Sequence, residues 1–119
     1  MKQGFIDALA APGPHPVLGA HAETYGRFIG SWEGELRSHM LAGPPSRASI
    51  EVHFSWALEG RAVQDVWITP ARKDRGRPGG APLDWYGTTL RVFDPKSESW
   101  RVMWSDPASQ LRIELEGRR

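Results

Sequence analysis

The stretch Ile29-Gly-Ser-Trp-Glu-Gly-Glu-Leu36 decides the fold that we expect for this chain. Small or apolar residues alternate in it with charged ones, and this period of two is typical of a β-strand with one dry and one wet face. Gly30 and Gly34 allow another segment to approach the backbone closely, because neither position carries a side chain. The stretch therefore predicts the first strand of a small barrel, with Trp32 at the floor of its interior.

Five further segments show strand patterns and predict an all-β, antiparallel domain. The clearest is residues 49–58, where five apolar side chains point to one face while Glu51, His53 and Ser55 point to the other. Pro- and Gly-rich segments at 41–48 and 70–84 separate the strands as loops. The predicted strands are residues 30–40, 49–58, 61–69, 85–93, 99–105 and 110–116.

The segment before the first strand predicts two short helices. Residues 4–11 are long enough for two helical turns, and the three prolines that follow within residues 12–16 stop regular structure. Within residues 21–29, Tyr25, Phe28 and Ile29 have helical spacing, which predicts an amphipathic helix packed on one end of the barrel. We therefore divide the chain into an N-terminal extension, 1–20, and a barrel domain, 21–119.

Composition bounds the class of protein. The 119 residues suit one domain, and six tryptophans supply ample apolar surface for its core. A net charge of +1 gives no general attraction to nucleic acid or to anionic membranes. The absence of cysteine excludes disulfides and thiolate zinc sites. Asp7 interrupts the only apolar run near the N-terminus, and no segment approaches the ~20 apolar residues of a membrane span. We expect a cytoplasmic protein.

Two turns determine which side chains face the interior. Gln64 and Asp65 are neighbours in one strand, so one of them must point inward. A two-residue turn at 59–60 would pair Trp56 with Val63 and place Asp65 inside, whereas a three-residue turn would place Gln64 inside. We expect Gln64 inside, because an amide is less costly to bury than a carboxylate.

The turn at residues 94–98 poses the same question. A four-residue loop would set Phe93 opposite Trp100, and a loop of odd length would set Leu90 and Val92 beside the tryptophans. We expect the odd loop, because it gives the drier face.

With these strands placed, the chain resembles the bacterial lipocalin-like (calycin-type) barrels of unknown function. The resemblance rests on residues 29–35, on Leu58-Glu-Gly-Arg-Ala-Val-Gln-Asp65, on Tyr86-Gly-Thr-Thr-Leu-Arg-Val-Phe-Asp-Pro95 and on Trp100-Arg-Val-Met-Trp-Ser-Asp-Pro107. It implies an up-and-down barrel with a cavity for a small, largely apolar molecule. Such barrels have about eight to ten strands, so the C-terminal strands are expected to be missing. Haem-binding relatives carry their ligating histidine in those late strands, and no histidine follows His53, so we expect no cofactor.

The candidate site is the predicted interior. Aromatic rings offer large, rigid contact surfaces there, and one buried polar group would orient a ligand. We expect binding of a small apolar or amphipathic molecule. The alternatives are a cofactor-free isomerase or cyclase, with Asp65 as general base beside Arg91, and a structural or interaction module with a filled core. No second catalytic group accompanies Asp65, so binding is favoured over catalysis. The expected ligand-binding residues are Trp32, Phe54, Trp56, Gln64, Asp65, Tyr86, Arg91 and Trp104.

The remaining charged groups predict ordinary surface chemistry. His39 and His53 are expected on the outer face near Glu51 as surface pairs and not as metal ligands. A basic run in the long loop is expected to be solvated and comprises Arg72, Lys73, Arg75 and Arg77. If the barrel is open, residues 110–116 present an unpaired edge, and we expect a second copy to cover it in a two-fold homodimer.

Overall fold

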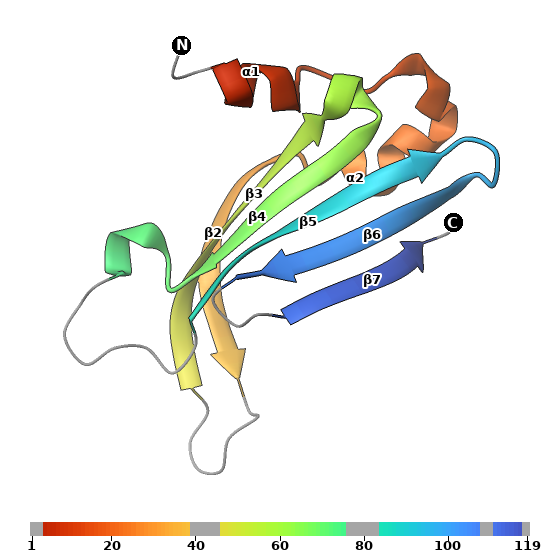
Figure 1. Cartoon of the computed structure of the whole chain (residues 1–119). Coiled ribbons are helices and arrows are strands. Elements are labelled where there is room, and N and C mark those ends of the chain that lie inside the picture. The colour runs from red at the N-terminus through yellow and green to blue at the C-terminus, as the bar shows by residue number, and fades with distance from the viewer. Residues whose placement is uncertain (1–3, 39–45, 76–83, 108–110, 118–119) are drawn as a thin grey trace.

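Six long strands form one antiparallel sheet in the computed structural model, which describes residues 4–38, 46–75, 84–107 and 111–117 (Figure 1). The predicted all-β antiparallel class is confirmed, because each predicted strand is present with its ends shifted by a few residues. The strands are β2 (Gly30–Ser38), β3 (Ser46–Ala57), β4 (Ala62–Thr69), β5 (Trp85–Asp94), β6 (Ser99–Asp106) and β7 (Leu111–Gly117).

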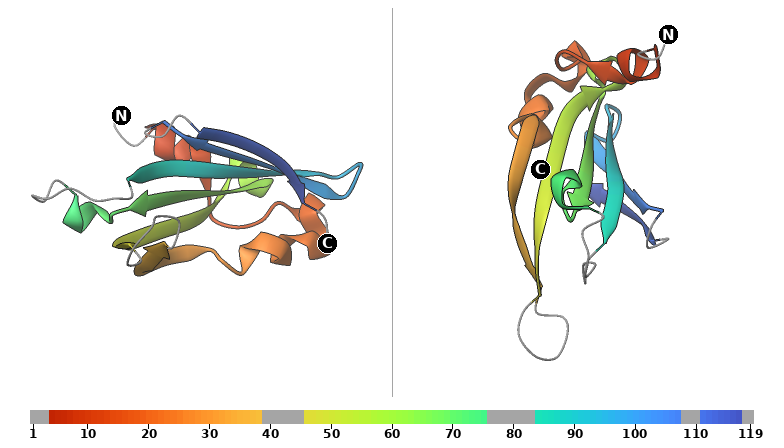
Figure 2. Two further views of the ribbon diagram at one scale, coloured as in Figure 1. Left: turned by 90° about the horizontal axis from the view of Figure 1, so that it is seen from below. Right: turned by 90° about the vertical axis from the view of Figure 1, so that its left-hand side faces the viewer.

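The sheet is curved but not closed (Figure 2). The strands follow one another in sequence order from β2 to β7, and the two-residue strand β1 (Ala10–Ala11) pairs with β3 beyond the end of β2. Among the described residues, β2 pairs only with β3, and β7 pairs only with β6. A calycin barrel is therefore not confirmed, and the homodimer stays a prediction.

Three short helices precede β2 and lie near one end of the sheet (Figure 1). They are α1 (Gly4–Leu9), the 3-10 helix η1 (Pro16–Ala22) and α2 (Glu23–Gly26). The first helix is shorter than predicted, because residues 10–11 pair with β3 instead of continuing it. The predicted helix over 21–29 is reduced to the single turn of α2. Two of the apolar side chains of residues 21–29, Tyr25 and Ile29, nevertheless pack against the core.

The core lies between these helices and one face of the sheet, which we call the inner face. Trp100 is its largest fully buried side chain and contacts Phe93 at a centroid distance of 5.2 Å and Tyr25 at 5.0 Å, the latter edge to face. Trp56 is also buried in this cluster, and Gly26 makes room for it, since a Cβ at that position would lie 2.7 Å from the indole ring. These contacts fasten the helical segment to the sheet.

The turn between β3 and β4 overturns the expectation for Gln64. The turn spans residues 58–61 and pairs Ala57 with Ala62, which sets Trp56 opposite Val63. This four-residue turn gives the same strand pairing as the two-residue turn at 59–60, so Asp65 lies opposite Phe54 and faces inward. Asp65 is fully buried. Gln64 lies on the opposite, outer face and donates a hydrogen bond to Thr88 (2.9 Å).

The turn between β5 and β6 also differs from the prediction. Asp94 pairs with Ser99, so the loop has an even length and Phe93 lies opposite Trp100. Leu90 and Val92 therefore lie on the outer face. The expectation of an odd loop is wrong. It assumed that the more apolar face of β5 points inward, but both faces of β5 carry apolar side chains, so this criterion does not identify the inner face.

Candidate functional site

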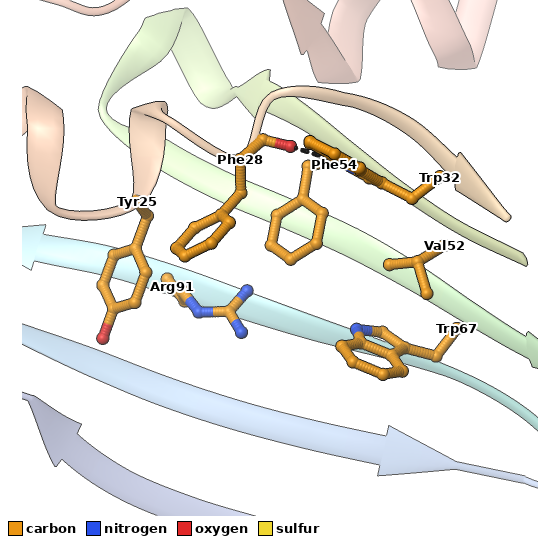
Figure 3. Close-up of a pocket in the computed structure, with 7 residues that line it drawn as sticks. All are labelled: Tyr25, Phe28, Trp32, Val52, Phe54, Trp67 and Arg91. Carbon is orange, nitrogen blue, oxygen red and sulfur yellow. Dashed lines mark hydrogen bonds between the residues drawn. The ribbon is translucent and has the colours of Figure 1, made fainter. Parts of the chain in front are cut away.

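A pocket with a volume of about 500 Å³ lies on the inner face of the sheet, beside the segment that follows α2 (Figure 3). Six of its seven lining side chains are apolar or aromatic, and the seventh is a guanidinium. The lining residues are Tyr25, Phe28, Trp32, Val52, Phe54, Trp67 and Arg91. The pocket therefore offers a mainly apolar surface with one fixed positive group.

Strand register brings most of the lining together. Trp32 and Trp67 are the two cross-strand neighbours of Val52, one on each side of it. Because directly opposite residues point to the same face of a sheet, these three side chains form one continuous patch. Arg91 joins them from β5, where it pairs with Val63 on the same face.

The rim of the pocket is aromatic and partly exposed. The indole N–H of Trp32 donates to the backbone carbonyl of Phe28 (2.9 Å), and the Phe28 ring packs on Phe54 at a centroid distance of 5.6 Å. Trp32 is 52% exposed and Phe28 39% exposed. The expectation of Trp32 at the floor of the interior is therefore wrong, because β2 lies at the edge of an open sheet. Large apolar side chains with this exposure gain free energy when a ligand covers them.

Arg91 carries the only charge among the described lining residues, and a hydrogen bond to Asp65 holds its guanidinium in place. Asp65 accepts hydrogen bonds from the Arg91 guanidinium and from the backbone N–H of Thr89 (3.0 Å). The guanidinium carbon lies 4.8 Å from the ring centroid of Tyr25 and 5.4 Å from that of Phe54. Arg91 thus faces the pocket, while Asp65 lies beneath it and has no exposed surface.

The structure separates the eight expected site residues into three groups. Trp32, Phe54 and Arg91 line the pocket, and Asp65 supports Arg91. Trp56 belongs to the buried core, and Trp104 packs over Gly87, where a Cβ would lie 2.6 Å from the indole ring. Gln64 and Tyr86 point to the outer face. For those two the expectation is wrong. Gln64 and Ile68 lie on the same face of β4, which is opposite to the face of Asp65, and Tyr86 pairs with Ile68.

Sequence reasoning missed four lining residues. Val52 lies two residues before Phe54 in the clearest predicted strand and therefore on the same face, so the alternation alone identifies it as a lining candidate. Trp67 follows from Asp65 once the register is known. The helical spacing predicts Tyr25 and Phe28 on the packing face of a helix, but α2 ends at Gly26, and Phe28 therefore lies at the pocket rim.

A second polar cluster lies on the outer face and links β3 to the segment after β4. Glu51 accepts three hydrogen bonds from Arg72. The donors are the backbone N–H (2.6 Å), Nε (2.9 Å) and Nη2 (2.7 Å) of Arg72. His53 lies between Glu51 (2.7 Å from Nε2) and Ser31 (2.8 Å from Nδ1). The Arg72 side chain is exposed to solvent, as expected, but it also forms an ion pair with a nearly buried carboxylate that the sequence analysis did not predict. His39 and Arg77 lie outside the described residues.

This cluster makes stability depend on pH. The bonds from Arg72 and then His53 lower the pKa of Glu51 from 4.5 to about 2. A lowered carboxyl pKa stabilises the fold above the unfolded pKa, and this stabilisation is lost as pH falls from 4.5 towards about 2. Because Arg72 is exposed and solvent screens it, we expect Glu51→Gln to cost only about 1–2 kcal/mol at neutral pH.

Urea denaturation across this pH range measures the difference between the native protein and Glu51→Gln, which should shrink as the solution is acidified. Glu33→Gln is the matched control, since Glu33 lies directly opposite Glu51 on β2 and is exposed. A difference that stays constant with pH would show that the carboxylate charge contributes nothing.

Fold and site together define an open antiparallel sheet with an apolar pocket on its inner face. Comparison of the chain with protein-family models, curated proteins and solved structures finds no match. The resemblance to lipocalin-like barrels therefore stays a prediction. No described helix has the length and hydropathy needed to span a membrane, and the described residues contain no group of three or more potential metal ligands.

Proposed function

We propose that this protein binds a small apolar or amphipathic molecule in the inner-face pocket. The observation that carries the proposal is the pocket itself, with its volume of about 500 Å³ and its aromatic lining. Ligand sites in proteins have volumes of about 300–1,000 Å³ and combine a mainly apolar surface with a few polar groups that orient the ligand. The resemblance to calycin-type barrels agrees with the same function.

The position of Asp65 favours binding over catalysis. A general base must come within hydrogen-bond reach of the proton that it removes. Asp65 is fully buried beneath Arg91 and is not part of the pocket lining. A molecule in the pocket therefore contacts the guanidinium and not the carboxylate, which speaks against the isomerase or cyclase alternative.

The exposed rim supplies a direct test. Titration with the uncharged fluorescent probe N-phenyl-1-naphthylamine should give saturable binding at micromolar concentration and quench the tryptophan fluorescence. Trp32→Ala should raise the dissociation constant about tenfold, because it removes a large ring from the pocket rim.

Tyr86→Ala is the matched control for this titration. Tyr86 is also a large aromatic residue, is 43% exposed and lies on the outer face. Its replacement should leave the dissociation constant unchanged. Linear, unsaturable binding, or an equal effect of both substitutions, would refute the proposed pocket.

A further inference from the structure

Arg91 points to the chemistry of the ligand. We infer that the pocket binds an uncharged aromatic molecule that carries a hydrogen-bond acceptor, such as the carbonyl oxygen of a ketone, ester or lactone, and that Arg91 donates to this oxygen. The inference rests on the proposed function, since it names the class of molecule that the same pocket takes.

The first argument is the balance of donors and acceptors in the pocket. A guanidinium has five N–H donors and no acceptor, and the bond to Asp65 uses Nη1. Figure 3 shows the Arg91 guanidinium among the rings of the lining, with its nitrogen atoms directed into the space between Phe54 and Trp67. The described residues of the lining include no carboxylate or amide side chain, so the pocket favours a ligand that accepts hydrogen bonds.

The second argument concerns charge. Asp65 has no exposed surface, so water does not screen its negative charge, and this charge already balances Arg91. A carboxylate ligand would bring a second anion to one guanidinium and would also lose its own hydration. A carbonyl oxygen forms a charge-assisted hydrogen bond with the same guanidinium and adds no net charge. The neutral acceptor is therefore preferred over the anion.

The third argument concerns the body of the ligand. Phe28, Phe54 and Trp67 present rings to the pocket, and Arg91 is itself held near the ring of Phe54. Aromatic rings prefer offset-stacked or edge-to-face contacts with other rings, and these contacts add to the free energy gained from burial. A flat aromatic body fits this lining better than a flexible alkyl chain, which loses more conformational freedom on binding.

Three naphthalenes that differ in one substituent test the inference. They are 2-acetylnaphthalene, 2-ethylnaphthalene and 2-naphthoate, each measured at neutral pH by displacement of N-phenyl-1-naphthylamine. We expect the ketone to bind at least about tenfold more tightly than the hydrocarbon, because a hydrogen bond to a charged donor contributes more than a neutral one. We also expect it to bind more tightly than the carboxylate.

Replacement of Arg91 should abolish the preference for the ketone. Arg91→Met alone leaves Asp65 buried without its charge partner and therefore risks unfolding. The double variant Asp65→Val with Arg91→Met removes both charges, and in it the ketone and the hydrocarbon should bind equally. Arg91→Lys keeps a cation opposite Asp65 and should retain part of the preference.

The outcomes distinguish this inference from the proposed function. If the ketone and the hydrocarbon bind the native protein equally, Arg91 does not bind the ligand, although the pocket remains a binding site. If the carboxylate binds most tightly, the pocket selects anions and the inference is wrong. If none of the naphthalenes and no fluorescent probe binds saturably, the proposed function and the inference both fail.

Discussion

Replacing Asp65 by alanine is expected to destabilise the protein by about 3–5 kcal/mol, because it leaves the Arg91 charge largely buried without its partner. Only 14% of the Arg91 side chain is exposed, and it lies against the rings of Tyr25 and Phe54. The backbone N–H of Thr89 also loses its acceptor. Urea denaturation followed by tryptophan fluorescence measures the loss.

A double variant separates the charge from the packing. Asp65→Val combined with Arg91→Met replaces the ion pair by apolar side chains and should recover the part of the loss that the unpaired charge causes, since a buried pair often contributes little net free energy. The part caused by the lost acceptor of the Thr89 N–H should remain. If instead the two substitutions destabilise the fold additively, Asp65 and Arg91 are not coupled, and the pair does not organise the pocket floor.

Truncation of Trp100 should have an effect of similar size. Trp100 is 1% exposed and packs against Phe93 and Tyr25, so Trp100→Ala opens a large cavity where the helical segment meets the sheet. Large-to-small substitutions of this kind cost about 3–5 kcal/mol, which is a large part of the total stability of a small domain. Thermal and urea denaturation should both show the loss.

Two milder substitutions serve as controls for Trp100→Ala. Trp100→Phe keeps a ring in the core and should cost about 1–2 kcal/mol. It removes an indole N–H that has no hydrogen-bond partner among the described residues, so no hydrogen bond is lost. Trp32→Ala truncates a half-exposed tryptophan and should cost less still. A loss from Trp100→Ala no larger than that from Trp32→Ala would show that the core is not centred on Trp100.

Strand positions were predictable from the sequence because they depend on local alternation. Trp32, Gly34 and Leu36 alternate with charged residues, and β2 forms there. In residues 49–58 the alternation also identified the inner face of β3, with Val52, Phe54 and Trp56 together. Each of these inferences needs only the period of two that the pleat imposes on any strand.

The candidate site was predictable only in part, because its composition depends on turn length and on helix length. Whether Gln64 or Asp65 faces inward follows from the parity of the turn at 58–61, which a sequence does not display. The cost of burying a carboxylate argued for Gln64, but it applies only to an unpaired group. The Asp65 carboxylate accepts hydrogen bonds from the N–H of Thr89 and from Arg91. These residues lie on β5, 24 and 26 residues further along the chain, respectively.

The sequence by itself determined the all-β class, the six long strands and the inward positions of Trp32 and Phe54, because these follow from contacts between near neighbours in the chain. Only the tertiary structure decided that the sheet is open, that Asp65 supports Arg91, that Tyr86 lies outside and that Arg72 is bound to Glu51. Each of these features joins residues from different elements. A period-two pattern identifies the inward face only where one face is clearly polar, and β4 and β5 carry apolar side chains on both faces. Their register therefore depends on turn geometry, which the sequence does not display.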